Sequence, residues 1–226
     1  MSTLDLSEET HWEKAAKTRM GKYLTRIETG FILKSIDTEK TSLIIDVGAE
    51  AGRFSLLSLT TNISVIGIDI DSYSLRRLKQ KNKEVVVIQA DARKTPFRNS
   101  SFDAVFMIEV LDYIPQLEEP LGESFRILKK DAPFVLSFGN QSSLKAKLRG
   151  LRGKSYMHSY GNVMKCLLKT GFQTSRKLGY SWLPFGRMSE SKLVPFFAGA
   201  EKLLRLGRMP RFSPWIILCA TKKSTQ

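Results

Sequence analysis

The sequence predicts an α/β protein built on a doubly wound, mostly parallel sheet of seven strands. Short β-branched and apolar runs alternate with helical patterns along most of the chain, which is typical of successive βα units. Three consecutive runs end on a carboxylate, and parallel strands bring such ends to one edge of a sheet. At 226 residues the chain can form one sizeable core, and no low-complexity linker divides it. We therefore expect a single domain over residues 1–226.

The first 40 residues are expected to form a helical lid. Apolar residues recur from Ser7 to Ile36 at three- and four-residue spacing, and Gly21 is the predicted break between two helices. Such a pair could pack on the sheet or cover a ligand bound at its edge. Residues 41–140 follow as the predicted ligand-binding core, and residues 141–226 as a basic part that holds the last two strands.

Each strand is expected where an apolar run is bounded by turn residues. The predicted strands are 43–47, 65–69, 85–90, 102–108, 134–138, 172–180 and 216–220. Helices are predicted at 51–59, 72–83, 117–128 and 163–169, with Asp71 or Ser72 capping the second and Gly171 ending the last. Ser189–Arg208 is predicted to be a basic amphipathic helix, interrupted near Pro195 because proline breaks helix interiors.

The stretch that identifies a ligand site is SLIIDVGAEAGRF, residues 42–54, a buried strand followed by a glycine turn. A carboxylate at Asp46, just before Gly48, would repel a pyrophosphate, so NAD is disfavoured and an ammonium or sulfonium ligand is favoured. Asp69 lies about 20 residues beyond Gly48, a spacing at which an acid can reach ribose hydroxyls. With Asp91 at the third strand end, three acids are expected around one polar ligand.

Several motifs occur in the order seen in the class I S-adenosylmethionine-dependent methyltransferases: DVGAEAG, VIGIDID, IQADARKTPF–SSFDAVFMIEVLDYI and RILKKDAPFVLSF. The chain resembles in particular the small-molecule branch typified by quinone-biosynthesis methylases, over about Ser42–Asn140. The resemblance implies a Rossmann-like methyltransferase fold, S-adenosyl-L-methionine as cofactor and S-adenosyl-L-homocysteine as product.

The resemblance also implies roles for individual residues. Asp46 would face the methionine ammonium, Asp69 the ribose hydroxyls and Asp91 the adenine amino group. The other implied cofactor contacts are Tyr23, Gly48, Ala49, Gly52, Ile70, Ala92 and Ile108. Glu50 departs from the pattern, because glycine usually fills the middle of the turn. Its side chain must therefore point outward or disturb the approach of the cofactor.

The sequence assigns no catalytic residue, because a methyl group on a sulfonium is already activated and positioning can supply much of the acceleration. A hydroxyl or acidic carbon acceptor would still need a general base. Candidates are Glu109, Asp112 and Tyr113 after the fourth strand, and Tyr156, His158 and Tyr160 in the basic part. The favoured alternative for Glu109 is a carboxylate bonded to backbone near the cofactor. His11 and His158 are expected to be surface histidines.

The positive charge is concentrated in the last third of the chain. Residues 141–226 contain 17 Lys or Arg and only two acids, Glu190 and Glu201, and so carry a net charge of +15. The whole chain has a net charge of +14, so residues 1–140 are close to neutral. This part could bind RNA or DNA, an anionic membrane surface or a small anionic substrate, or it could be a solvated face. We favour a small or lipid-like, anionic acceptor. The alternatives are a nucleic-acid methyltransferase, and a non-catalytic RNA- or partner-binding module on the same fold.

Cysteine content and hydropathy indicate the compartment. Cys166 and Cys219 are too few for a disulfide framework and fit no metal site, so buried, reduced thiols and no metal are expected. No apolar run approaches the roughly 18 residues of a membrane span, and residues 1–13 are unlike a signal peptide. A cytoplasmic protein is therefore expected. The sequence does not indicate the oligomeric state.

Overall fold

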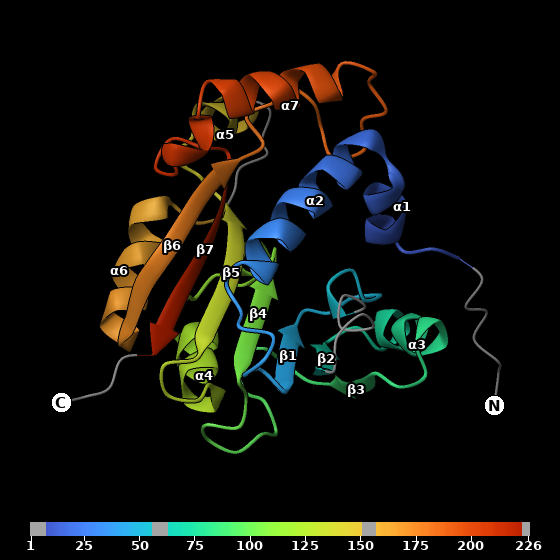
Figure 1. Ribbon diagram of the computed structural model, residues 1–226, viewed down its shortest axis with the longest axis vertical. Helices are drawn as coiled ribbons and strands as arrows, with labels where there is room; N and C mark the ends of the chain where they lie inside the picture. The colour runs from blue at the N-terminus through green and yellow to red at the C-terminus, as the bar shows by residue number, and fades with distance from the viewer. Residues whose placement is uncertain (1–7, 56–62, 151–156, 223–226) are drawn as a thin grey trace.

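The computed structural model describes residues 8–55, 63–150 and 157–222, and they contain one seven-stranded sheet (Figure 1). The strand order is β3-β2-β1-β4-β5-β7-β6. The first five strands are parallel, and β7 pairs antiparallel with both β5 and β6. The strands are β1 (Leu43–Val47), β2 (Ser64–Asp69), β3 (Val86–Gln89), β4 (Ala104–Ile108), β5 (Pro133–Gly139), β6 (Phe172–Tyr180) and β7 (Trp215–Lys222). The predicted fold class is confirmed, with strand bounds shifted by at most two residues.

Helices cover both faces of the sheet (Figure 1). They are α1 (His11–Lys17), α2 (Arg19–Leu33), α3 (Ser72–Lys81), α4 (Glu118–Ile127), α5 (Leu144–Gly150), α6 (Tyr160–Thr170) and α7 (Val194–Leu203), with single 3₁₀ turns η2 (Leu111–Tyr113) and η3 (Leu206–Arg208). In β4, Val105 and Met107 pack toward the core under α4 and α6, whereas Phe106 and Ile108 pack toward the core under α2 and α7. Alternate residues of a strand point to opposite faces, so one strand serves both cores.

The N-terminal helices divide at Thr18, and the predicted break at Gly21 is wrong. Thr18 is the C-cap of α1 and the N-cap of α2, and its hydroxyl accepts the Gly21 N–H at 2.9 Å. Gly21 lies inside α2 instead, where a Cβ atom would collide with the carbonyl group of Ala15. The glycine therefore allows the two helices to approach closely.

Two further expectations about helices are corrected. Pro195 stands in the first turn of α7 and begins this helix, because the first turn has no backbone hydrogen bond for proline to remove. The helix predicted at 51–59 is not seen at its start, since residues 51–54 form turns, and 56–62 lie outside the described residues. Asp71 caps α3 as predicted, and Gly171 ends α6.

Both cysteines are buried and free, as predicted. Within 8–55, 63–150 and 157–222, no helix combines the length and the apolar character that crossing a bilayer requires. The same residues hold no cluster of three or more His, Cys, Asp or Glu side chains arranged to bind a metal.

Substituting Gly171 with alanine is expected to destabilise the protein by about 1–2 kcal/mol. Gly171 has a φ of 102°, and an added Cβ would lie 3.1 Å from the ring of Phe125. Gly161, in the first turn of α6, is the matched control because a Cβ there meets nothing within 4 Å. Urea unfolding of both variants measures the effect, and equal midpoints for the two would contradict this account.

Candidate functional site

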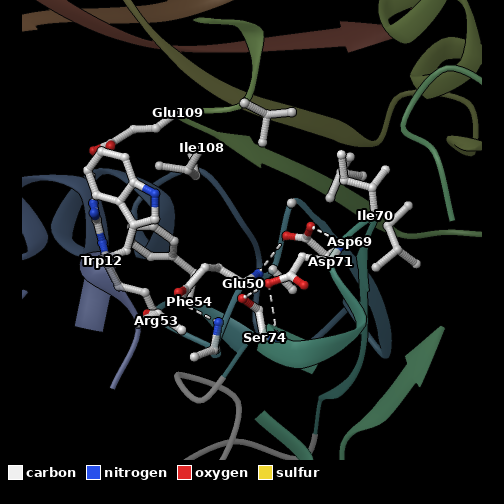
Figure 2. Close-up of a pocket in the computed structure, with 18 of the residues that line it drawn as sticks. Trp12, Glu50, Arg53, Phe54, Asp69, Ile70, Asp71, Ser74, Ile108 and Glu109 are labelled. Atoms are coloured by element: carbon white, nitrogen blue, oxygen red, sulfur yellow. Dashed lines mark hydrogen bonds and ion pairs between the residues drawn. The ribbon is translucent and has the colours of Figure 1, made fainter. Parts of the chain in front are cut away.

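A cavity of about 1260 Å³ lies at the carboxyl ends of the parallel strands (Figure 2). The turn after β1, the loops after β2, β3 and β4, and helix α1 line it. Of the residues predicted to contact a cofactor, those at the cavity are Gly48, Ala49, Gly52, Asp69, Ile70, Asp91, Ala92 and Ile108. The topology therefore brings together residues that are spread over 60 positions of the sequence.

Asp69 presents a carboxylate with free acceptor capacity. Its Oδ2 accepts the Glu50 N–H at 3.0 Å and its Oδ1 accepts the Asp71 N–H at 2.9 Å, so two backbone bonds fix its orientation. Each carboxylate oxygen can accept a further hydrogen bond, which suits a pair of vicinal hydroxyls. Beside it, Ile70 exposes 70% of its surface and offers an apolar contact at the cavity.

Asp91 is already engaged by a cation. Arg93 donates to it from its backbone N–H at 2.9 Å and from Nη2 at 2.6 Å. These hydrogen bonds lower the pKa of Asp91, so it stays ionised at neutral pH. An incoming amino group would share this carboxylate with Arg93.

Glu50 turns inward and forms part of the cavity wall. Its φ of 48° is left-handed, which favours glycine, and its Oε2 accepts the N–H of Ala51. Its Oε1 is buried and has no hydrogen-bond partner among the described residues. Burial raises the pKa of Glu50 more than its hydrogen bonds lower it. Of the two alternatives for Glu50, the outward side chain is therefore wrong, and interference with the approach of the cofactor stays a prediction.

Two predicted cofactor residues do not line the cavity. Asp46 is only 2% exposed, and its Oδ2 accepts the Ser55 hydroxyl at 2.6 Å. Burial raises the pKa of Asp46 to about 7. The Tyr23 hydroxyl donates instead to Glu201 of α7 at 2.5 Å, because α2 turns this side chain toward α7.

Glu109 is bound by two guanidinium groups and not by backbone. It follows β4 at a φ of 64°, and its carboxylate lies 3.2 Å from Arg53 Nη2 and 2.5 Å from Arg187 Nη1. Although burial opposes ionisation, the two arginines hold the pKa of Glu109 below its usual range. This arrangement corrects both expectations for Glu109, because an ionised, doubly paired carboxylate is a poor general base.

Of the other two candidates after β4, only Tyr113 reaches the cavity. Asp112 accepts the Gly139 N–H at 2.8 Å and does not line the cavity. Burial raises the pKa of Asp112 to about 6, and it also raises the pKa of Tyr113. The Tyr113 hydroxyl therefore stays protonated at neutral pH.

The candidates of the basic part lie elsewhere. His158 is buried, and its Nε2 lies 3.0 Å and 2.8 Å from the carbonyl oxygens of Leu111 and Ile114, so the expectation of a surface histidine is wrong. Tyr160 does not line the cavity, and Tyr156 lies outside the described residues. His11 is exposed, as predicted.

A buried Arg–Glu network that sequence reasoning did not predict lies beside the cavity, formed by Glu28, Arg53, Glu109 and Arg187. Arg53 pairs with Glu28 and Glu109, and Arg187 pairs with Glu109. The Tyr180 hydroxyl donates to Glu28 at 2.5 Å. Four separate segments supply these charges, so no local spacing could reveal the network.

Helix α1 is held over the cavity by aromatic and ionic contacts. The Arg187 guanidinium lies 4.7 Å from the ring centre of Trp12, which lines the cavity. Glu13 pairs with Arg77 at 2.5 Å and with Lys81 at 2.6 Å, both on α3. Although burial raises the Glu13 pKa, these two cations lower it to about 2. Helix α1 thus lines the cavity while α2 packs on the sheet, and the lid role of α1 stays a prediction.

Comparison with known proteins identifies the core of the chain. Residues 45–136 match a family described as "Methyltransferase domain". This match confirms the predicted resemblance to the class I S-adenosylmethionine-dependent methyltransferases over these residues. The methyltransferase cavity suits the cofactor of this family: Asp69 has lone pairs for a diol, Ile70 offers apolar surface, and residues 48–52 provide a glycine turn.

Other relatives match part of the chain. An uncharacterized protein of Methanocaldococcus jannaschii is 32% identical over 117 residues, which are 52% of this chain and 49% of that protein. "Sterol methyltransferase-like 1" of Botryococcus braunii is 33% identical over 100 residues, which are 41% of this chain and 26% of that protein. The chain thus spans half or less of the length of these relatives.

The fold extends beyond the matched residues. A SAM-dependent methyltransferase from Archaeoglobus fulgidus superposes with a TM-score of 0.66 at 16% identity, covering 95% of this chain and 100% of that one. The order and direction of all seven strands therefore belong to a known architecture.

Replacing Asp46 with asparagine is expected to stabilise the protein above pH 7 and to have little effect below about pH 4. The folded-state pKa of about 7 exceeds the usual 3.8, so the native protein holds a proton that the unfolded chain releases. Wild-type stability therefore falls as pH rises between these values. The gain at alkaline pH should be on the order of 2–4 kcal/mol. Urea unfolding across this pH range measures it, with Glu84→Gln, at an exposed carboxylate, as control.

Replacing Glu50 with glycine is expected to stabilise the protein by about 1–2 kcal/mol, because it removes a left-handed non-glycine residue and a buried carboxylate. Glu50→Gln keeps the backbone conformation and removes only the charge. Thermal unfolding compares the two, and a greater loss of stability for Glu50→Gly than for Glu50→Gln would refute the assignment of backbone strain.

Proposed function

We propose that this chain transfers the methyl group of S-adenosylmethionine to a small or lipid-like, anionic acceptor. The observation that carries the proposal is the Asp69 carboxylate, oriented by the glycine turn of a methyltransferase domain and free to accept two hydroxyl groups. The bound cofactor would supply a methyl group activated by a sulfonium.

The residues of the cavity have distinct roles in this proposal. Asp69 would accept hydrogen bonds from the ribose hydroxyls. Asp91 would accept a hydrogen bond from the adenine amino group and keep its ion pair with Arg93. Backbone groups of residues 48–52 would border the methionine part, with Ile70 and Ala92 at the adenine and Ile108 near the methyl group. Asp46 would act through the turn that it supports, because it does not reach the cavity.

The cavity can hold more than the cofactor. Its volume of about 1260 Å³ exceeds the roughly 1,000 Å³ upper range of ordinary small-molecule pockets. The remaining lining includes the aromatic side chains of Trp12, Phe54 and Tyr113, together with Lys17 and Lys22. The aromatic part of this lining favours a lipid-like acceptor, and the sterol methyltransferase-like relative supports the same class.

The protonation states of the acidic and phenolic groups also favour an anionic acceptor. Glu109 is held ionised by two arginines, and the Tyr113 hydroxyl is held protonated, so neither is ready to remove a proton. An acceptor that arrives as an anion already carries its nucleophilic lone pair and needs no base. Tyr113 could then donate a hydrogen bond that orients it.

Asp69→Asn is expected to weaken binding of S-adenosylhomocysteine by roughly tenfold, because it removes the charge from the hydrogen bonds to the ribose. Titration calorimetry measures the dissociation constants of the wild type, Asp69→Asn and Asp37→Asn, the last a control at an exposed acid outside the cavity. Absence of binding to the wild type would overturn the cofactor assignment.

The acceptor class is tested by transfer of labelled methyl groups into separated lipid, small-molecule and RNA fractions. Label in the lipid or small-molecule fraction is expected. Label in RNA would establish the alternative of a nucleic-acid methyltransferase. RNA binding that is steeply salt-dependent and unaffected by cofactor, without any transfer, would establish a non-catalytic binding module.

A further inference from the structure

Helix α7 carries large apolar side chains on its outer surface. Phe196 is 71% exposed and Leu203 is 83% exposed, far more than side chains of this size in a packed helix. We call the set the α7 face, and it consists of Leu193, Phe196, Leu203 and Leu204. Contiguous exposed apolar side chains mark an interaction surface more often than isolated ones do.

The opposite side of α7 is packed against the rest of the molecule. Val194 is buried in the core under α2, Phe197 packs edge-on against Phe185 at 5.5 Å, and Glu201 accepts the Tyr23 hydroxyl. Phe196 and Leu203 are seven residues apart and so lie on one side of the helix. Packing within the described chain therefore explains one side of α7 but not the other. Figure 1 shows α7 along an outer edge of the molecule, beyond the end of the sheet.

Exposed cations alternate with the residues of the α7 face along the chain. The exposed basic side chains of this segment are Lys192, Lys202, Arg205, Arg208 and Arg211. Its two acids are engaged elsewhere, since Glu201 is buried against Tyr23 and Glu190 accepts the backbone N–H of Arg19. A surface of apolar side chains with a positive rim is complementary to the interface of a bilayer that contains acidic lipids.

We propose that the α7 face docks on an anionic membrane surface. Phe196 and Leu203 enter the boundary between headgroups and acyl chains, and the surrounding Lys and Arg side chains meet the lipid phosphates. Two other occupants fit less well. A nucleic acid would meet the cations but gain little from exposed leucines, and a second copy in a twofold contact would bring the same cations against each other.

Docking in this way would place the bilayer against a segment that is bonded to α2 and to the wall of the cavity. Helix α7 is bonded to α2 through Tyr23 and Glu201, and the loop before α7 carries Arg187, which pairs with Glu109 at the cavity. A membrane-embedded acceptor could thus approach beneath the lid. The docking itself does not depend on the proposed methyl transfer, and its test needs no cofactor.

Flotation with vesicles tests the proposal. The full-length protein is mixed with phosphatidylcholine vesicles or with vesicles in which about a third of the lipid is phosphatidylglycerol. The wild type is expected to float with the acidic vesicles at least tenfold more than with the neutral ones, and the difference should shrink in about 1 M salt. Recovery of the wild type in the buffer fraction of both would overturn docking.

Two pairs of matched variants locate the surface. Phe196→Glu/Leu203→Glu should reduce acidic-vesicle binding roughly tenfold or more, whereas Leu168→Glu, at a 76% exposed leucine on α6, should bind like the wild type. Lys202→Glu/Arg205→Glu should also lose binding, and Lys165→Glu/Lys169→Glu, with the same charge change on α6, should lose less. Circular dichroism confirms that each variant is folded.

Three results would contradict the assignment to α7. One is equal vesicle binding by Phe196→Glu/Leu203→Glu and the wild type. Another is a wild-type dimer in sedimentation that these substitutions convert to a monomer, without vesicle binding, which would identify a second copy as the occupant. The third is binding of a labelled RNA oligonucleotide that the Lys202→Glu/Arg205→Glu variant loses, again without vesicle binding.

Discussion

The buried Arg–Glu network is the interaction on which the arrangement of the site depends. Arg53, from the turn after β1, lies between Glu28 of α2 and Glu109 after β4, and Arg187 reaches Glu109 from the loop before α7. Glu28 is fully buried, and a buried charge is tolerated only when it is paired. Loss of one partner in such a network costs about 3–5 kcal/mol, because another charge is left uncompensated. The four charges cancel, so they join four segments without leaving net charge in the interior.

This network connects the cofactor turn to the segments that would select the acceptor. Arg53 follows Gly52 directly, and Arg187 lies over Trp12 of the lid, so turn, lid and α7 loop share one set of contacts. Movement of the lid would therefore disturb the pairing of Glu109. Because these contacts involve Glu109, its carboxylate holds the site together and is poorly suited to proton transfer.

The two carboxylates at the turn, Asp46 and Glu50, show a second constraint: burial removes water from them and disfavours their charged form. Burial raises the pKa of both Asp46 and Glu50, and the backbone of Glu50 also has a left-handed conformation. Perturbed acids and strained backbone concentrate at functional sites, where the surrounding fold holds them in place. Two backbone N–H groups orient the Asp69 carboxylate, which lies at the cavity and can accept hydrogen bonds from a ligand.

The sequence by itself determined the seven strands, the three acids at their ends and the glycine turn. These features are local, since a strand or turn is encoded by the residues that form it, and parallel topology then brings the strand ends together. Only the tertiary structure decided where side chains point: Tyr23 bonds to Glu201, Asp46 faces Ser55, and His158 is buried. The Arg–Glu network could not be predicted either, because its members come from distant segments and pair only through packing. In the stretch 42–54, the sequence identified Glu50 as the unusual residue, and the structure showed that its side chain turns into the cavity wall.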